Sequence, residues 1–225
     1  MDFDSFTLLA ATADLADEPA ARADADGMEL RMDFAEAPLA MIEAYDGQLP
    51  LLVTNRVEWE GGEGDDTAAR LDALEAAIED DAVAAVDVEL AALDGEGDHD
   101  ATRVVEHARN QDVSVVVSTH DFEATPEEAT LVDRLERACS YGDVGKIATT
   151  AQARSDVLAL LAATHTLTEA GHTVATMAMG EAGRHSRVVA PLYGARIGYA
   201  PVDPADATAP GQYDLATLRQ LVTAL

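Results

Sequence analysis

Residues 113–121 read Val-Ser-Val-Val-Val-Ser-Thr-His-Asp, a nearly continuous β-branched stretch that ends in polar side chains. Strands of parallel sheets are buried on both faces, so they lack the apolar–polar alternation of a half-exposed strand. In α/β proteins built on parallel strands, chemistry lies at the carboxyl ends of the strands. The stretch therefore predicts a buried parallel strand, Val113–His120, whose polar end lies at a functional site.

Similar apolar or β-branched segments recur along the chain, and stretches with helical spacing lie between them. Each segment has the length of a strand in a globular domain. Besides Val113–His120, the candidate strands are Phe6–Thr12, Met28–Phe34, Leu49–Arg56, Ala85–Leu90, Val144–Thr149, Thr173–Met179 and Ala195–Ala200.

The intervening segments predict amphipathic helices. Asp66–Ile78, Ser155–Ala163 and Asp214–Leu225 carry apolar residues three and four positions apart, and Asp214 is a suitable cap for the last of them. Thr125-Pro126-Glu127-Glu128 predicts another helix start, with threonine as the cap and Glu128 completing a capping box. This helix is expected to end near Gly142.

Eight strands that alternate with helices predict a (β/α)8 barrel that forms a single catalytic domain over residues 1–225. If one strand were miscounted, a doubly wound open sheet would remain as the alternative. No dinucleotide fingerprint or phosphate-binding loop follows the first strand, which weakens that alternative.

Composition restricts the setting of the protein. Hydrophobic residues make up 48% of the chain, enough for a sizeable core, but no apolar run is long enough to cross a membrane. The first residues lack the basic and apolar regions of a signal peptide. Cys139 is the only cysteine, so an internal disulfide is excluded. We therefore expect a cytoplasmic protein without a membrane partner.

The chain is strongly acidic, with 43 Asp and Glu against 14 Lys and Arg and a formal net charge of -29. Nucleic acid is excluded as a partner on this basis, because phosphate binding requires a basic surface. The acidic residues are spread in short clusters rather than gathered in a tail. Such a charge keeps a protein dissolved in concentrated salt, so we interpret it as adaptation to a saline cytoplasm, as in haloarchaea. An ordinary acidic protein is the alternative.

Lys146 is the only lysine in the chain; the other 13 basic residues are arginines. Arginine can replace lysine as a surface charge, but it cannot readily lose its proton to act as an amine nucleophile. A chain that has dispensed with every other lysine therefore points to a chemical role for Lys146. Chance survival of one lysine is the alternative.

Polar residues gather at the predicted carboxyl ends of the strands. Strand alternation places Glu29, Arg31 and Asp33 on one face of the second strand. Arg56 ends the third strand, and His120 ends the fifth. Each has a structural alternative: Glu29 and Arg31 could pair with each other, and His120 could be a hydrogen-bonded structural residue.

Taken together, these residues predict a pocket that carries Lys146, a histidine and three arginines, of which Arg187 is the third. Such a cationic pocket in an acidic protein would attract a small anion. A lysine beside an acid–base group on a barrel rim indicates imine formation with a carbonyl substrate. From the residues alone, a lyase and an aldolase both remain open.

The chain resembles the type I 3-dehydroquinate dehydratase family over nearly its whole length. Single motifs are weak, but seven in the family's order are specific. The matching segments are Glu29-Leu30-Arg31-Met32-Asp33; Thr54-Asn55-Arg56 with Glu60-Gly61-Gly62; Asp87-Val88-Glu89; Ser118-Thr119-His120-Asp121-Phe122 with Thr125-Pro126; Asp143-Val144-Gly145-Lys146-Ile147-Ala148; Met179-Gly180 with Gly183 and Ser186-Arg187; and Ala209-Pro210-Gly211-Gln212.

The resemblance implies a role for each matching residue. Lys146 is expected to form the imine, His120 to act as general acid and base, and Glu60 to orient His120. The implied substrate-binding residues are Glu29, Arg31, Arg56, Arg187, Thr208 and Gln212. Thr208 stands where the family usually has serine; the hydroxyl is kept, so we expect the contact to survive.

The resemblance also implies an activity and its setting. The family are hydro-lyases of the shikimate pathway of aromatic amino-acid biosynthesis, and they dehydrate 3-dehydroquinate to 3-dehydroshikimate without a metal or organic cofactor. A homodimer is the assembly that the family leads us to expect. The hairpin that covers the barrel bottom in bacterial relatives is expected to be missing. The rivals are a class I aldolase, which leaves Glu60-Gly61-Gly62 unexplained, and a non-catalytic protein that binds a small anion.

Overall fold

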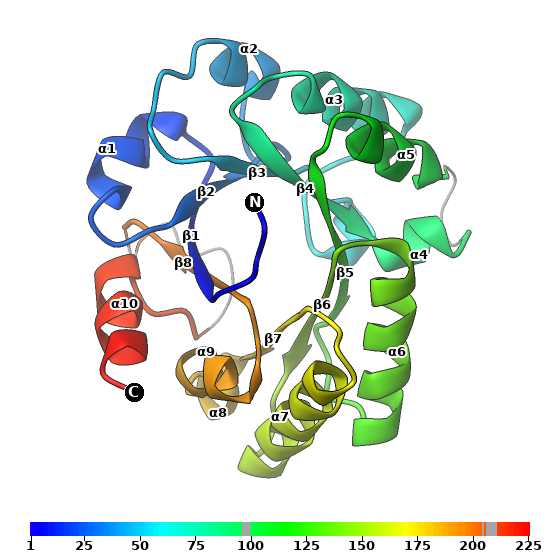
Figure 1. Ribbon diagram of the computed structural model, residues 1–225, viewed down its shortest axis with the longest axis vertical. Coiled ribbons are helices and arrows are strands. Elements are labelled where there is room, and N and C mark those ends of the chain that lie inside the picture. Colours follow the sequence, from blue (N-terminus) through cyan, green and yellow to red (C-terminus); the bar gives the residue numbers. More distant parts are fainter. Residues whose placement is uncertain (96–99, 204, 206–210) are drawn as a thin grey trace.

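The computed structural model describes residues 1–95, 100–203, 205 and 211–225. Eight parallel strands form one sheet in the order β7-β6-β5-β4-β3-β2-β1-β8. An isolated parallel bridge between Val174 and Ala195, with the Arg196 amide donating to the Val174 carbonyl at 2.8 Å, brings β7 to β8. The sheet is therefore curled into a nearly closed barrel with helices around it, as Figure 1 shows, and the predicted (β/α)8 fold is confirmed.

The strands lie close to their predicted positions. They are β1 (Thr7–Thr12), β2 (Gly27–Arg31), β3 (Leu51–Thr54), β4 (Val83–Glu89), β5 (Ser114–Asp121), β6 (Val144–Thr150), β7 (Val174–Met179) and β8 (Ile197–Pro201). β2 ends three residues before the predicted Phe34, because the chain turns at Arg31, whose carbonyl accepts from the Phe34 amide.

The helices cover the outer face of the barrel. They are α1 (Glu18–Ala21), α2 (Pro38–Glu43), α3 (Ala68–Ile78), α4 (Leu90–Leu93), α5 (Thr102–Asn110), α6 (Glu128–Tyr141), α7 (Arg154–Glu169), α8 (Gly180–Gly183), α9 (Ser186–Val189) and α10 (Leu215–Thr223), with short 3-10 turns η1 (Leu15–Asp17), η2 (Glu58–Glu60) and η3 (Ala190–Tyr193). No described helix is both long enough and apolar enough to cross a membrane.

The predicted cap of α6 is wrong, whereas that of α10 is confirmed. α6 begins at Glu128 after Glu127, which makes no side-chain capping bond. The Thr125 hydroxyl instead donates to the Thr150 carbonyl at 3.0 Å and lies 2.9 Å from the Thr149 hydroxyl, so it ties the β5–α6 loop to β6. In α10 the Asp214 side chain accepts from the Thr217 amide, as a cap should.

The sequence of β5 lacks an apolar–polar alternation because both faces of the strand are buried. Val115 and Val117 pack outward against the helices, whereas Val116 packs inside the barrel with side chains such as Leu9 and Leu52. Both faces are fully buried, so both select apolar residues.

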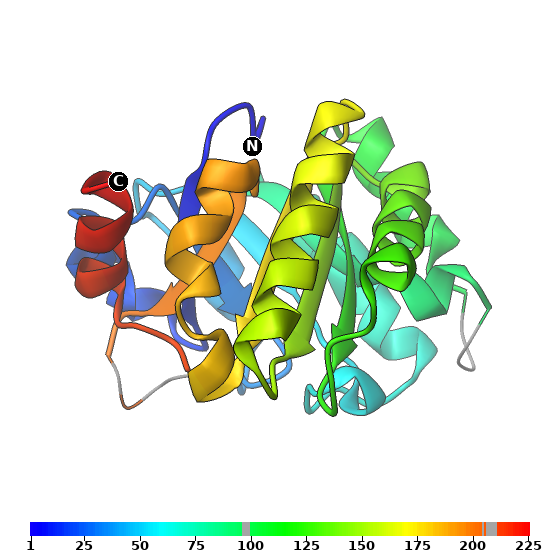
Figure 2. The same cartoon turned by 90° about the horizontal axis from the view of Figure 1, so that it is seen from below.

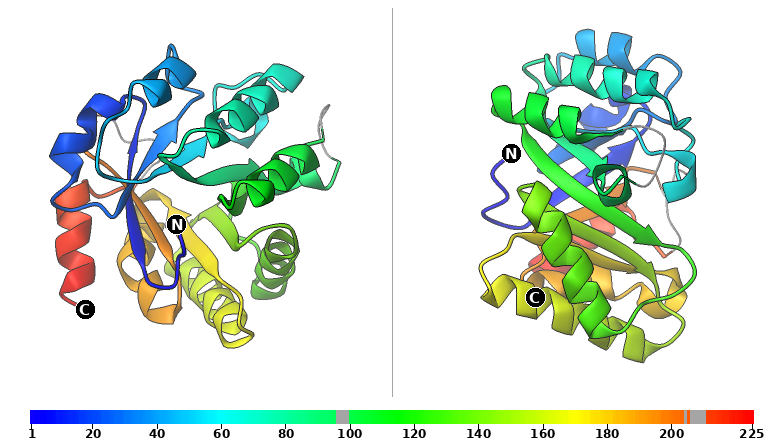
Figure 3. Two further views of the ribbon diagram at one scale, coloured as in Figure 1. Left: turned by 45° about the horizontal axis from the view of Figure 1, so that its top comes forward. Right: turned by 90° about the vertical axis from the view of Figure 1, so that its right-hand side faces the viewer.

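The first residues fill one end of the barrel. Phe3 is 2% exposed and belongs to the interior cluster with Leu9 and Val116. The Met1 amine donates to the Ala84 carbonyl at 2.9 Å, and the Ser114 hydroxyl donates to the Met1 carbonyl. Figures 2 and 3 show this segment curling over the end of the barrel from which the strands begin. The N-terminal residues therefore close this end of the barrel, and the pocket described below lies at the other end.

Candidate active site

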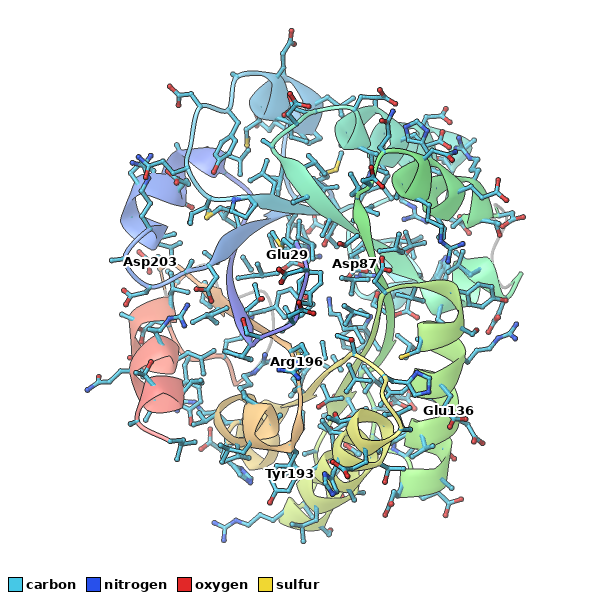
Figure 4. The ribbon with its side chains drawn as sticks, viewed as in Figure 1. Glu29, Asp87, Glu136, Tyr193, Arg196 and Asp203 are labelled. Atoms are coloured by element: carbon cyan, nitrogen blue, oxygen red, sulfur yellow. The ribbon has the colours of Figure 1, made fainter. Side chains whose placement is uncertain are left out.

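One pocket at the carboxyl ends of the strands, with about 570 Å³ of empty space, collects the predicted site residues. Figure 4 shows two acidic side chains, Glu29 and Asp87, pointing toward the barrel axis, whereas Glu136 and Tyr193 lie on the outside. The pocket is lined by Glu29, Arg31, Thr54, Arg56, Glu60, Gly61, His120, Phe122, Lys146, Ala148, Met177, Met179, Arg187, Tyr199 and Gln212. Eight of the nine predicted residues are in this lining; the ninth, Thr208, lies outside the described residues.

Lys146 comes from β6 and is held on the pocket floor by Asp87 of β4. Its Nζ lies 2.8 Å from Asp87 Oδ2, and the lysine is only 5% exposed. Asp87 Oδ1 accepts from Arg56 Nη2 and from the Ser118 hydroxyl, each at 2.6 Å. Burial alone would raise the pKa of Asp87, but Arg56 and Lys146 more than offset this and hold the pKa well below its usual range. Asp87 is therefore a carboxylate that anchors both cations.

His120 comes from the end of β5, the strand next to Lys146. Its Nδ1 lies 2.6 Å from Glu60 Oε2. When Glu60 is ionised, its carboxylate accepts from Nδ1–H, and Nε2 is then the nitrogen that can accept a proton. Burial and the positive charges of Arg56 and Lys146 lower the pKa of His120 well below its usual value. The imidazole is therefore neutral near pH 7 and can accept a proton.

The motif Glu60-Gly61-Gly62 positions the carboxylate partner of His120. Glu60 ends the η2 turn, and Gly61 follows in the left-handed region at φ +81°. A Cβ on Gly61 would lie 2.3 Å from the Phe122 ring, which itself stacks on His120 with 5.8 Å between ring centroids. Gly61 therefore allows the turn to approach His120 closely.

Burial raises the pKa of Glu60 to about 7, although the charge of Arg56 opposes this.

The β2 residues do not pair with each other. Arg31 forms a two-point ion pair with Asp33, at 2.9 Å from Nε and 2.6 Å from Nη2. Glu29 instead accepts from the Thr54 hydroxyl at 2.9 Å. Both are buried, and both line the pocket.

Arg187 is the one arginine of the pocket lining for which the described residues provide no ion pair. It is 5% exposed, and its Nε has no hydrogen-bond partner within the part of the chain that the structure describes. Burial without a compensating anion lowers the pKa of Arg187 to about 10. The adjacent Ser186 fixes this segment, because its hydroxyl accepts from the Ala178 amide at 2.8 Å. Arg187 is thus a buried cation suited to an anionic ligand.

The pocket is less cationic than the sequence suggested. Asp33 neutralises Arg31, and Asp87 and Glu89 flank Arg56, at 2.6 and 3.1 Å. Glu89 is in turn bonded by Arg70 at 3.2 Å, so this network extends away from the pocket. Positive charge available to a ligand is therefore concentrated at Arg187.

The sequence assigns no role to several other pocket residues. Asp87 lies within a matching motif, but its contact with Lys146 depends on how three strands are aligned. Met177 and Met179 belong to the buried interior cluster, as apolar strand residues should, and both also line the pocket. Sequence reasoning missed Tyr199, although alternation along β8 would have turned it inward. Among the described residues, no group of His, Cys, Asp or Glu is arranged to hold a metal ion.

Comparison with known proteins identifies the family. A family model described as type I 3-dehydroquinase matches residues 7–225. The 3-dehydroquinate dehydratase of Haloarcula marismortui is 72% identical over 99% of this chain and 97% of that protein. The enzyme of the same name from Halobacterium salinarum is 49% identical over the full length of both.

Solved structures agree in fold. 3-Dehydroquinate dehydratase from Geobacillus kaustophilus matches with a TM-score of 0.85 and 28% identity, over 99% of this chain and 91% of that one. The type I enzyme from Clostridium difficile, solved with covalently modified comenic acid, matches with a TM-score of 0.83 and 27% identity, over 98% and 92%. The resemblance noted in the sequence is confirmed: this chain belongs to the type I 3-dehydroquinase family.

Proposed function

We propose that this protein is a 3-dehydroquinate dehydratase that forms 3-dehydroshikimate through an imine on Lys146. The observation that carries the proposal is the burial of the chain's only lysine in the pocket, bonded to Asp87 and beside the His120–Glu60 pair. An amine can form an imine with a ketone, a neutral imidazole can transfer the proton, and a buried arginine can bind a carboxylate, so these groups suit the dehydration of a carboxylated ketone.

The first half of the reaction makes an electron sink. Lys146 first releases a proton, and its neutral amine attacks the ketone carbon. The released proton and a second proton from the same nitrogen reach the former ketone oxygen, which leaves as water, while the nitrogen keeps its last proton in the protonated imine. The carbon next to the imine is now more acidic than it was beside the ketone. His120 Nε2 takes a proton from that carbon, and the electron pair moves to the imine nitrogen to form an enamine. Glu60 keeps Nδ1 protonated, so that Nε2 stays the accepting atom.

The second half expels the hydroxyl group. The enamine electrons return and break the carbon–oxygen bond, while His120 returns its proton so that the group leaves as water. Hydrolysis of the product imine then releases the conjugated ketone and restores Lys146. We assign the substrate carboxylate to Arg187, the cation without a partner in the described pocket, with Gln212 beside it. To Glu29, Arg31 and Arg56, which line the same pocket, we assign contacts with the ring hydroxyls or the carboxylate.

Trapping with borohydride tests the proposal. Borohydride reduces a protonated imine to a stable secondary amine, so addition with 3-dehydroquinate should inactivate the enzyme and leave one adduct. Because the chain has no second lysine, that adduct should map to the peptide that contains Lys146. Ultraviolet absorbance of the conjugated product measures turnover in the same sample. An active preparation with no adduct, or with an adduct on the N-terminal amine alone, would overturn the imine mechanism.

A further inference from the structure

The hydroxyl group of Tyr199 is a buried polar group in the lining of the pocket. Tyr199 comes from β8 and is 5% exposed. Its hydroxyl has no hydrogen-bond partner within the part of the chain that the structure describes. Burial removes a hydroxyl from bulk water, so a hydroxyl that bonds to no other group lowers stability. This hydroxyl therefore does not help to hold the described barrel together, and a ligand that bonds to it would offset the unfavourable burial.

The surroundings of the hydroxyl suit an uncharged ligand atom. Burial raises the pKa of the Tyr199 hydroxyl well above its usual value; the negative charges of Glu29 and Asp87 add to this, and the positive charge of Arg56 opposes it. The hydroxyl is therefore neutral, and it lies in the field of charged groups that come from β2, β4 and the end of β3. A neutral hydroxyl can both donate and accept a hydrogen bond, so it matches another hydroxyl.

The ring of Tyr199 determines which part of a substrate the hydroxyl meets. The Lys146 nitrogen lies 4.4 Å from the centre of that ring, and in the proposed reaction this nitrogen bonds to the ketone carbon. The hydroxyl is attached to the same ring, so it lies beside the ketone carbon and its neighbours rather than at the carboxylate, which we assign to Arg187. One neighbour of the ketone carbon in 3-dehydroquinate is the methylene that loses the proton, and the other carries a hydroxyl group.

We propose that the Tyr199 hydroxyl is a substrate-binding group that forms a hydrogen bond with the substrate hydroxyl next to the ketone. The inference rests on the proposed function, because it requires a hydroxyketone bound at Lys146. It makes Tyr199 a specificity-determining residue: a ketone that lacks this hydroxyl leaves a buried polar atom of the protein unpaired and is rejected.

Removal of the hydroxyl should weaken binding without weakening the fold. Tyr199→Phe keeps the ring over Lys146. We expect KM for 3-dehydroquinate and Kd for 3-dehydroshikimate to rise by about 10-fold. The hydrogen bond is made before and during the reaction alike, so kcat should change by less than about 2-fold. The midpoint of urea unfolding should stay the same or rise, because the variant buries one polar group fewer.

Tyr45→Phe is the matched control, because the Tyr45 hydroxyl is satisfied within the protein. It donates to the Leu49 carbonyl at 2.7 Å, and Tyr45 does not line the pocket. This variant should lower the midpoint of urea unfolding and leave KM and Kd unchanged. If the Tyr199 hydroxyl served the fold instead of the ligand, Tyr199→Phe would behave like this control, and that result would overturn the proposal.

A ligand analogue tests the contact itself. 3-Dehydroshikimate and its analogue without the hydroxyl next to the ketone are each titrated calorimetrically, in molar salt, into the wild-type and Tyr199→Phe proteins. If the two hydroxyls bond to each other, loss of the ligand hydroxyl should weaken binding to the wild-type protein by about 10-fold more than binding to the variant. Equal losses in the two proteins would overturn the contact, even if Tyr199→Phe had raised KM.

The outcomes separate this inference from the proposed function. A wild-type enzyme that dehydrates 3-dehydroquinate and forms the adduct on Lys146, together with a Tyr199→Phe variant of unchanged KM, would overturn the role of the hydroxyl alone. A wild-type protein without activity on 3-dehydroquinate would overturn both.

Discussion

Asp87 and Lys146 form a buried ion pair at 2.8 Å, and the same carboxylate also accepts from Arg56. Asp87→Asn should leave two buried cations without that anion and lower the free energy of unfolding by about 3–5 kcal/mol. Displacement of the amine should reduce kcat by about 10²-fold. Denaturant unfolding and steady-state kinetics in molar salt measure the two effects.

Asp72→Asn is the matched control, because Asp72 pairs with Arg103 on the surface and is 65% exposed. It should cost less than about 1 kcal/mol and leave turnover unchanged. If Asp87→Asn behaved like this control, Asp87 would have no anchoring role.

The pH dependence of turnover should report Glu60, whose pKa is raised to about 7 by burial. Below that value the carboxyl is protonated and no longer accepts from His120 Nδ1–H, so kcat should rise as the pH increases through about 7. Glu60→Gln should lower the plateau and remove this inflection. An unchanged inflection in the variant would assign the ionisation to another group.

The Glu60 carboxyl should also make the free energy of unfolding depend on pH, and this free energy should fall over the range in which kcat rises. The folded protein binds this proton more tightly than the unfolded chain, where the pKa is near its ordinary 4.5. Stability should therefore fall as the pH rises from about 4.5 to about 7. Glu60→Gln should remove that slope and gain up to about 3 kcal/mol at pH 8, as urea melts at several pH values can measure.

His120→Ala should separate imine formation from dehydration. The variant should still form the adduct on Lys146, slowly, but product formation should fall by about 10²–10⁴-fold, the usual contribution of proton transfer. The matched control is His107→Ala, since His107 also contacts a glutamate, Glu79, at 2.6 Å but on the surface. The control should retain full turnover, and near wild-type activity of His120→Ala would exclude His120 from the mechanism.

Arg187 should reduce the stability of the free enzyme while supporting substrate binding. Its burial without an anion is unfavourable, so Arg187→Met should raise the free energy of unfolding by about 1–3 kcal/mol. Loss of the carboxylate partner should raise KM by about 10²-fold. Arg154→Met, at an exposed arginine, should do neither. A destabilised variant with normal KM would contradict both expectations.

The acidic composition predicts a requirement for salt. With a net charge of -29, folding brings acidic residues together. Repulsion acts over about 30 Å at 0.01 M salt but only about 3 Å at 1 M. Activity and helical circular dichroism should both fall when molar salt is dialysed away and return when it is restored, with sodium and potassium chloride alike. Full activity and an unchanged melting temperature in millimolar buffer would contradict this.

The fold could be predicted from the sequence because burial on both faces leaves a local signal. The Val113–His120 run and its seven counterparts specified strands to within three residues. The predicted cap of α6 was wrong because Thr125 bonds across to β6, a long-range contact that outweighs a local capping pattern.

The sequence predicted which residues meet in the pocket, because they lie at the carboxyl ends of the strands. It did not predict which of them form ion pairs. Arg31 forms an ion pair with Asp33, and Lys146 of β6 forms one with Asp87 of β4, across the intervening strand β5. Those choices depend on register and side-chain reach. For the same reason the sequence predicted a cationic pocket with three arginines, whereas two of these arginines are ion-paired within the described structure.

The burial of the only lysine also fixes how the surface responds to alkali. Most proteins lose positive charge near pH 10 as surface lysines deprotonate, but arginine keeps its proton beyond about pH 12. Outside the pocket, burial raises the pKa of Tyr45 to about 12 and raises the pKa of the Cys139 thiol above its usual value; neither group carries positive charge. The positive charge of the surface is therefore nearly constant from neutral to strongly alkaline solution. Raising the pH in this range should not remove surface cations, whatever the salt concentration.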